Sequence, residues 1–313
     1  MYLTLTLNPS IDHYMRLPSG KLLKTGTKEA PSVNRASSES FEAGGKGINV
    51  AKILSRLQAD VAATGFTAGF TGSEIARNIE AEGIESSFIE VPGCTRINLK
   101  ITDGSGIETE INGPGPVIGP GDIKRLIEVL KNDSYDTLFI SGSMPGGLPS
   151  DTYANIIKAV KETRPALRVI TDFEGEALLR TLPFKPFLIK PNAAELSALT
   201  GHKISTASSL TDIKKAASIL IEDGACNVLI SLGANGACLL TSEGNFYSVH
   251  GIKGDVISTI GAGDTMIASF IFMLDRSGDH QTALKFSNEC ASLSAFTKGL
   301  PSAKALGNIL SNY

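Results

Sequence analysis

The sequence has little of what an exported, membrane-bound or metal-clustered protein needs. Its four cysteines, at 94, 226, 238 and 290, form no CxxC pair and no Cys/His cluster, so we expect reduced core thiols. The longest apolar run, 266–274, is about half of the roughly 20 residues that cross a bilayer, and it predicts a buried helix. Residues 1–7 lack the features of a signal peptide, so we expect a cytoplasmic protein without a membrane partner.

The chain also lacks an excess of charge of one sign. Lys and Arg total 29 against 32 for Asp and Glu, which gives a net charge of -3. No broad positive field is then available to hold nucleic acid, and we expect no nucleic-acid partner. An anionic ligand would have to be bound by local basic residues.

Short apolar or β-branched runs alternate with stretches of helical spacing along the chain. Such alternation predicts an α/β fold with a mostly parallel central sheet covered by helices on both faces. The runs that predict buried strands are 3–7, 61–64, 137–140, 169–171, 187–189 and 228–230.

One segment departs from this rhythm, because residues 95–102 and 107–112 alternate strictly around a turn at 103–106. Ile97 and Leu99 fall on one face of this hairpin, and Arg96 and Asn98 fall on the other. An isolated hairpin is marginal in water, so its apolar face needs a partner. We predict a small β-sheet lid from about 12–42 and 92–113, with strands in the polar stretch 34–42 and around 15–23, paired across a homodimer.

Polar and Gly-rich residues follow the predicted strands, where parallel sheets bind ligands. The sharpest motif is Gly261-Ala262-Gly263-Asp264, which opens the apolar helix at 266–274. Small residues and free N–H groups at a helix start make an anion cradle. Asp264 beside that cradle has the chemistry of a base that accepts a proton from an attacking hydroxyl. The alternative is an Asp that only complements the helix dipole.

A second Gly loop enters a helix at Gly44-Gly45-Lys46-Gly47-Ile48-Asn49. Lys46 offers a cation and Asn49 an amide, which suits sugar hydroxyls and a phosphate, although a tight turn with a solvated Lys would read the same. The chain has no GxxxxGK[ST] loop, and no dinucleotide fingerprint stands out, which disfavours an oxidoreductase.

Three further residues are candidates on weaker signals. Asn192 and Glu195 follow the strand at 187–189 and could hold a hydrated Mg²⁺, or Glu195 could be a helix-start acid. Arg96 could clamp a substrate phosphate with bidentate geometry, or it could be a solvated strand residue. The four histidines fall in no motif.

Taken together, these residues resemble the ribokinase-like, or pfkB-type, carbohydrate kinases, and most closely the 1-phosphofructokinase and tagatose-6-phosphate kinase branch. The resemblance covers nearly the whole chain, and ETEINGPGP at 108–116 is most like the 1-phosphofructokinase subgroup. The motifs that carry it are LTLNPSID (5–12), AGGKGINV (43–50), TRIN (95–98), ISGSMPGG (140–147), KPN (190–192) with Glu195, SLGANGA (231–237) and GAGD (261–264).

The resemblance implies a single ribokinase-like domain over 1–313, a three-layer αβα core with the lid, and ATP-dependent phosphorylation of a ketose phosphate. It implies Asp264 as catalytic base, the amides of Gly261, Ala262 and Gly263 as anion hole, and Asn192 with Glu195 as Mg²⁺ site, with a monovalent cation left open. Substrate-binding residues would be Asp12, Gly44, Gly45, Lys46, Asn49, Arg96 and Ser143, and nucleotide-binding residues Lys190, Asn192, Ser231, Gly233, Gly236 and Asn288.

Two positions depart from the pattern of this branch. Glu174 replaces the Ser of its usual Asp-x-Ser-Gly motif, and a carboxylate there would repel phosphate if it faced the site. Ala68 stands where a second Gly is common. These departures bear on substrate preference more than on kinase identity. The segment at 108–116 makes fructose 1-phosphate the expected substrate, with tagatose 6-phosphate and fructose 6-phosphate as alternatives and a non-catalytic sugar-phosphate sensor as a different class.

Overall fold

The computed structural model describes residues 1–28 and 30–313, and Glu29, within the stretch expected to form the lid, lies outside them. Its main sheet has the strand order β14-β13-β12-β11-β10-β9-β1-β4-β5, with β6 paired to β4. The strands from β12 through β5 are parallel, and β13 and β14 form an antiparallel edge. Their bounds are β1 Tyr2–Thr6, β4 Val61–Thr67, β5 Glu85–Ser86, β6 Ile89–Glu90, β9 Thr137–Ser141, β10 Arg168–Asp172, β11 Leu188–Ile189, β12 Asn227–Ser231, β13 Ala237–Thr241 and β14 Phe246–Val249.

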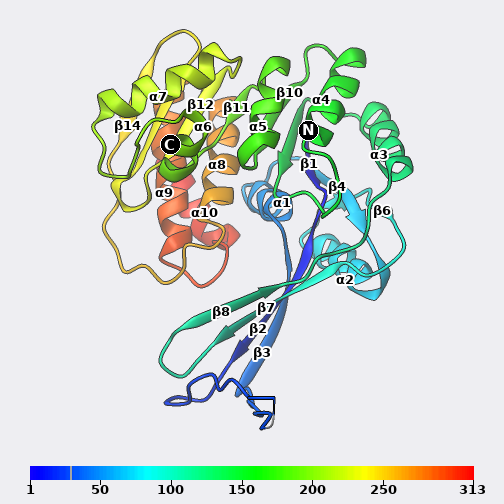
Figure 1. Ribbon diagram of the computed structural model, residues 1–313. Coiled ribbons are helices and arrows are strands. Elements are labelled where there is room, and N and C mark those ends of the chain that lie inside the picture. Colours follow the sequence, from blue (N-terminus) through cyan, green and yellow to red (C-terminus); the bar gives the residue numbers. More distant parts are fainter. Residues whose placement is uncertain (29) are drawn as a thin grey trace.

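Helices cover both faces of this sheet and make the three-layer fold of Figure 1. One core contains residues of α3 Pro120–Asn132, α4 Thr152–Thr163, α5 Gly175–Thr181, α6 Ala193–Thr200 and α7 Leu210–Glu222. The other contains residues of α1 Lys46–Arg56, α2 Gly69–Ala81, α8 Ala262–Ser277, α9 His280–Ala295 and α10 Ala303–Leu310. Short 3₁₀ turns lie at Leu182–Phe184 and Gly233–Asn235.

The strand β12 shows how the sequence produces two cores. Its side chains alternate across the sheet, so Val228 and Ile230 pack in one core and Leu229 in the other. All three are fully buried, as expected for a parallel strand covered on both sides. The α/β fold with a mostly parallel sheet is therefore confirmed.

The predicted strands all exist, with ends shifted by a few residues. The predicted buried helix at 266–274 is the centre of α8, which runs on to Ser277 and ends at Gly278 with a left-handed φ of 69°. The antiparallel edge strands β13 and β14 are not among the predicted ones.

A separate four-stranded sheet has the order β3-β2-β7-β8 and projects from the body as a long arm (Figure 1). Its strands are β2 Ser10–Arg16, β3 Ser38–Gly44, β7 Arg96–Thr102 and β8 Glu108–Asn112. The strand expected around 15–23 is wrong in position: β2 begins right after Pro9 and ends at Arg16, just before Pro18, which cannot donate to a ladder. We refer to this four-stranded sheet as the lid.

The two faces of the lid have opposite surroundings. On its polar face Asn98 is only 7% exposed, whereas on its apolar face Phe41, Ile97 and Ile111 are 54%, 39% and 59% exposed. The polar face therefore meets the body at Asn98. The apolar face is covered only at its base, where Ile11 and Ala43 are buried in the second core, and the described residues leave Phe41, Ile97 and Ile111 exposed.

The cysteines are free, as expected, but only Cys238 and Cys290 belong to the core. Cys94 is exposed and Cys226 is partly exposed, so the expectation of four core thiols is wrong for these two. Among the described residues, no helix has both the length and the apolar character to cross a membrane.

Candidate active site

A large cavity of ≈ 1360 Å³ lies at the carboxyl ends of the parallel strands, between the body and the polar face of the lid. Of the predicted site residues, only Gly44 and Gly236 do not line it. The predicted residues that do are Asp12, Gly45, Lys46, Asn49, Arg96, Ser143, Lys190, Asn192, Glu195, Ser231, Gly233, Gly261, Ala262, Gly263, Asp264 and Asn288. Segments from the whole chain thus converge on one space.

Asp264 sits in the first turn of α8, where the helix opens with Gly261 in the left-handed region at a φ of 77°. The first N–H groups of a helix have no acceptor inside it, and here they face the cavity beside the carboxylate. The Ala262 N–H donates instead to the carbonyl of Thr259 at 3.3 Å. The amides of Gly263 and Asp264 are therefore the better placed of these donors for an anion.

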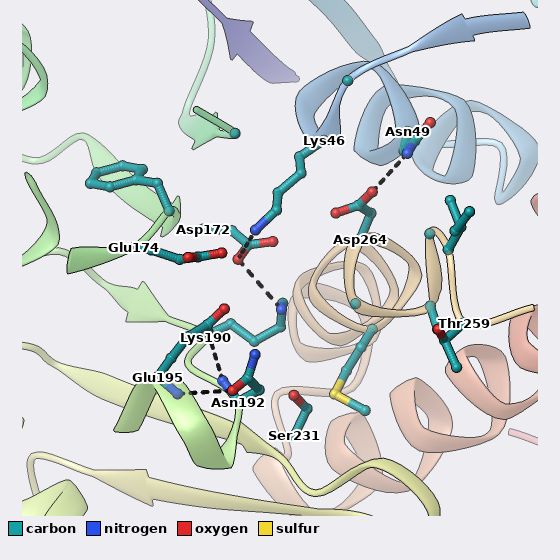
Figure 2. A pocket seen from close by; sticks show the side chains of 18 of the residues that line it. Lys46, Asn49, Asp172, Glu174, Lys190, Asn192, Glu195, Ser231, Thr259 and Asp264 are labelled. Atoms are coloured by element: carbon teal, nitrogen blue, oxygen red, sulfur yellow. Dashed lines mark hydrogen bonds and ion pairs between the residues drawn. The ribbon is translucent and has the colours of Figure 1, made fainter. Parts of the chain in front are cut away.

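The carboxyl group of Asp264 is 6% exposed and receives a hydrogen bond from Asn49 on α1, with 2.7 Å between Nδ2 and Oδ2 (Figure 2). Burial is the main cause that raises the pKa of Asp264, to about 6, and the charge of Asp172 adds to it. The Asn49 hydrogen bond, Lys190 and Lys46 act in the opposite direction. A carboxylate with this pKa is ionised at neutral pH and can accept a proton.

Two lysines meet on Asp172, which is not among the predicted site residues. Its Oδ1 lies 3.3 Å from Lys46 Nζ and 3.4 Å from Lys190 Nζ (Figure 2). Burial opposes the charge of Lys46, but Asp172, Asp264 and Glu195 outweigh it and raise its pKa. Its signals in the sequence were its position directly after a predicted strand and its place as the Asp of the Asp-x-Ser-Gly motif.

Asn192 and Glu195 form a reciprocal capping box at the start of α6. Asn192 Oδ1 accepts from the Glu195 N–H at 2.9 Å, and Glu195 Oε2 accepts from the Asn192 N–H at 2.8 Å. Glu195 is thus a helix-start acid, and burial raises its pKa. Its Oε1 has no hydrogen-bond partner in the described chain and remains available.

Asn192 and Glu195 suit a Mg²⁺ ion that keeps most of its waters, and do not form a site in which protein side chains surround the metal. Among the described residues, no group of three or more His, Cys, Asp or Glu side chains could hold a metal. Mg²⁺ commonly binds through one or two carboxylates, substrate phosphates and several waters. Glu195, with one free oxygen at the cavity wall, suits that mode.

The other predicted nucleotide residues lie along the same wall. Ser231 at the end of β12 pairs with Asn192 in a parallel bridge, and Asn288 on α9 donates to the His250 carbonyl at 3.0 Å. Gly236 does not line the cavity, because its backbone packs against the next strand: a Cβ there would lie 2.0 Å from the Val249 oxygen. Gly236 therefore shapes the turn around Gly233 rather than the cavity wall.

On the lid side, Asp12 is held by three neighbours. Its Oδ1 accepts from Ser10 at 2.8 Å and from Asn98 at 3.0 Å, and its Oδ2 lies 3.5 Å from Lys100 Nζ. Gly44 is needed because a Cβ would come within 2.7 Å of that carboxylate. Asn98 and Lys100 were not among the predicted site residues, although the alternation placed Asn98, and with it Lys100 two residues on, on the polar face of the hairpin.

Arg96 enters the cavity from the base of the same strand. Its Nε donates to the Asn8 carbonyl at 3.2 Å, and burial lowers its pKa. It is therefore a fixed, half-buried cation rather than a solvated one. Ser143, after β9, lines the cavity as well.

The two departures from the family pattern differ in consequence. Glu174 is exposed but lines the cavity, so its charge faces the site (Figure 2). Ala68 is buried with a φ of -148°, an ordinary extended conformation that needs no glycine.

The site combines a buried acid with free helix amides, two lysines and an arginine of the lid. The amides and cations can hold a phosphorylated ligand, and the acid can take a proton from its hydroxyl. Fold and site together define a kinase of small phosphorylated or hydroxylated molecules. The chain matches the pfkB family carbohydrate kinases over residues 5–304, and it belongs to that family.

Individual relatives agree with this assignment. The chain is 35% identical over 311 residues to the 1-phosphofructokinase of Bacillus subtilis, covering 99% of this chain and 97% of the relative. It is 35% identical to the D-tagatose-1-phosphate kinase of Bacillus licheniformis, with 96% and 94% covered. Phosphofructokinase-2 from Escherichia coli, in complex with fructose-6-phosphate, has a TM-score of 0.87 and 28% identity, with 99% and 98% covered.

Proposed function

We propose that this kinase transfers the γ-phosphoryl group of ATP to fructose 1-phosphate and forms fructose 1,6-bisphosphate and ADP. The observation that carries the proposal is the buried Asp264 at the opening of α8, inside a cavity that also receives Arg96 and Asp12 from the lid. This arrangement brings a base, anion donors and residues that can hold a sugar phosphate into one cavity.

Asp264 acts as the base in this mechanism. As the acceptor oxygen attacks the γ-phosphorus, its proton passes to the Asp264 carboxylate and the bond to the departing ADP oxygen breaks. Asp12 and Asn49 orient the sugar hydroxyls, and Arg96 and Ser143 hold the existing phosphate. Negative charge on the transferring oxygens is stabilised by the first-turn amides of α8 and by Lys46 and Lys190.

ATP would lie along the wall made by Lys190, Asn192, Ser231, Gly233 and Asn288. Mg²⁺, when bound, neutralises charge on the phosphates, and Glu195 with Asn192 would hold it through its waters. A monovalent cation is compatible with this proposal but is not needed to derive it.

The substrate preference rests on the relatives and on the cavity's charges. The negative charge of the exposed Glu174 on the body side of the cavity would repel the phosphate group of the substrate. We therefore place that phosphate group at the lid, near Arg96. Tagatose phosphates and fructose 6-phosphate are the alternatives. A non-catalytic sensor would not need a buried Asp264 with a raised pKa.

The test is ADP release from ATP with a panel of these sugar phosphates, with the product of the best substrate identified by ³¹P NMR. We expect fructose 1-phosphate to have the highest kcat/KM and to give a bisphosphate. A higher kcat/KM for a tagatose phosphate or fructose 6-phosphate would reassign the substrate, and no ADP release with any of them would overturn the kinase. ATP without sugar should be hydrolysed very slowly, because a lid that closes over the cavity would exclude water.

We also propose that the lid pairs with that of a second copy in a cytoplasmic homodimer. The exposed Phe41, Ile97 and Ile111 share its apolar face, and such a patch is costly unless another surface covers it. Ile97→Glu should yield monomers in sedimentation velocity. Leu210→Glu, at an exposed residue of α7, is the control and should leave the assembly unchanged; a wild type that sediments as a monomer would contradict the pairing.

A further inference from the structure

Asp172 ends β10 as a buried carboxylate with two cations on a single oxygen. It is 3% exposed, and its Oδ1 forms ion pairs with Lys46 Nζ at 3.3 Å and Lys190 Nζ at 3.4 Å. Its Oδ2 is buried and has no hydrogen-bond partner in the described chain. A structural ion pair needs only one cation, so this convergence calls for another explanation.

The two lysines come from opposite sides of the cavity. Lys46 begins α1, which also carries Asn49 and follows the Gly44-Gly45 turn. Lys190 follows β11 and precedes Asn192, on the nucleotide side. Its Nζ lies 3.0 Å from where a Cβ would stand on Gly263, so it faces the first turn of α8. Asp172 thus joins cations from the acceptor side and the donor side next to the reacting position.

Holding these ammonium groups in place requires a fixed anion. A lysine has a flexible four-carbon stem that loses rotamer entropy when it is held in place, and two like charges repel each other. Asp172 overcomes both effects, because its own position is set by the β10 backbone, which pairs with β9 and β11. Groups fixed before the reaction are the ones that lower its barrier most.

We propose that Asp172 is a positioning residue for phosphoryl transfer, which holds Lys46 and Lys190 on either side of the transferring group. The inference rests on the proposed kinase function. Asp172 does not touch the reacting atoms; it acts through the two lysines and through its charge on Asp264. The charged groups that face Asp264 are Asp172 from β10, Lys190 after β11 and Lys46 from α1.

The same strand supplies a matched control. Arg168, at the opposite end of β10, forms an ion pair with Asp275 at the end of α8, where Asp275 also accepts a hydrogen bond from Tyr2. Asp275 does not line the cavity. Asp275→Asn therefore removes a partly exposed ion pair of the same strand by the same chemical change, without reaching the site.

The experiment compares kcat, KM and the pH profile of wild type, Asp172→Asn and Asp275→Asn. We expect Asp172→Asn to lower kcat roughly 10²-fold with little change in KM, because the lysines act on the transition state. Its acid limb should move to lower pH, since a charge that raises the pKa of Asp264 is gone. Asp275→Asn should keep the wild-type kcat and acid limb even if it melts earlier.

A second variant and an NMR titration separate a loss of positioning from a failure to fold. Lys190→Met removes a cation that lowers the pKa of Asp264, so its acid limb should move to higher pH, which covers the case of an unfolded Asp172→Asn. A ¹³C NMR titration of the Asp264 carboxyl needs no turnover and should show the same shifts. An inactive wild type would overturn the proposed function, whereas an active wild type with Asp172→Asn indistinguishable from Asp275→Asn, or with no shift of Asp264, would overturn this inference.

Discussion

Asn49 donates to Asp264 across 2.7 Å, joining the first turn of α1 to the first turn of α8 over 215 residues of sequence. The bond holds Oδ2 of the carboxylate, and Oδ1 has no hydrogen-bond partner in the described chain (Figure 2). It thereby leaves one oxygen free to receive a proton. The two Gly loops that stand out in the sequence are coupled through this contact.

The pH dependence of the reaction follows from burial of Asp264. Its pKa is raised to about 6, so the free enzyme loses its base as the pH falls below that value. We expect kcat/KM to fall about tenfold per pH unit below pH 6. A steady-state profile from pH 5 to 8 with fructose 1-phosphate measures the limb, and a limb near pH 4 would mean that the base is unperturbed or is another group.

Replacing Asn49 should move that limb. Asn49→Ala removes the hydrogen bond that lowers the pKa of Asp264, so the limb should shift to higher pH and kcat/KM should fall at all pH values. Asn78→Ala on α2 is the control, because among the described residues its amide hydrogen-bonds only to Glu74, and Asn78 does not line the cavity. An unshifted limb in Asn49→Ala would contradict the assigned coupling.

The raised pKa also has a stability cost. A carboxyl whose pKa is higher in the folded state stabilises the fold when protonated, and this stability is lost as the pH rises from about 4 through about 6. Asp264→Asn avoids that loss. Its free energy of unfolding at pH 8 should exceed that of wild type by about 2 to 3 kcal/mol, and the difference should vanish near pH 4. Urea unfolding at both values measures it, and equal stabilities at pH 8 would contradict it.

Substitution of Gly263 tests the anion site and leaves the base, Asp264, unchanged. A Cβ there meets Lys190 Nζ at 3.0 Å, the end of a flexible side chain, so Gly263→Ala should fold but displace that lysine. We expect kcat to fall roughly 10- to 100-fold. Gly307→Ala, in α10 with open space around it, should gain about 0.5 to 1 kcal/mol and keep full activity. Normal turnover by Gly263→Ala would remove Lys190 and this turn from the reaction.

The local patterns of the sequence predicted much of the fold because each is a direct consequence of periodicity. The run at 228–230 reads as a buried strand, and the Gly loop before 266–274 marks a helix start. The alternation in 96–102 separated Arg96 and Asn98 from Ile97, but it could not say which face meets the cavity, because that depends on how the lid is attached to the body.

Site residues that stand in one local sequence motif could be predicted. Site residues that meet only because the fold brings distant segments together could not. Asp264 and Lys46 stand in recognisable Gly loops. Asp172 gains its role only because the crossovers of the sheet bring Lys46 and Lys190 to the same strand end, and no spacing in the sequence encodes that meeting. Gly236 shows the reverse, since its motif membership suggested a ligand contact that close backbone packing explains instead.

The central claim is that Asp264 takes the proton of the acceptor hydroxyl, and the turnover of Asp264→Asn tests it most directly. With fructose 1-phosphate and ATP at pH 8, kcat should fall roughly 10² to 10⁴-fold, while calorimetric binding of the sugar phosphate stays close to that of wild type. A variant that binds the sugar phosphate and turns over at the wild-type rate would contradict the account.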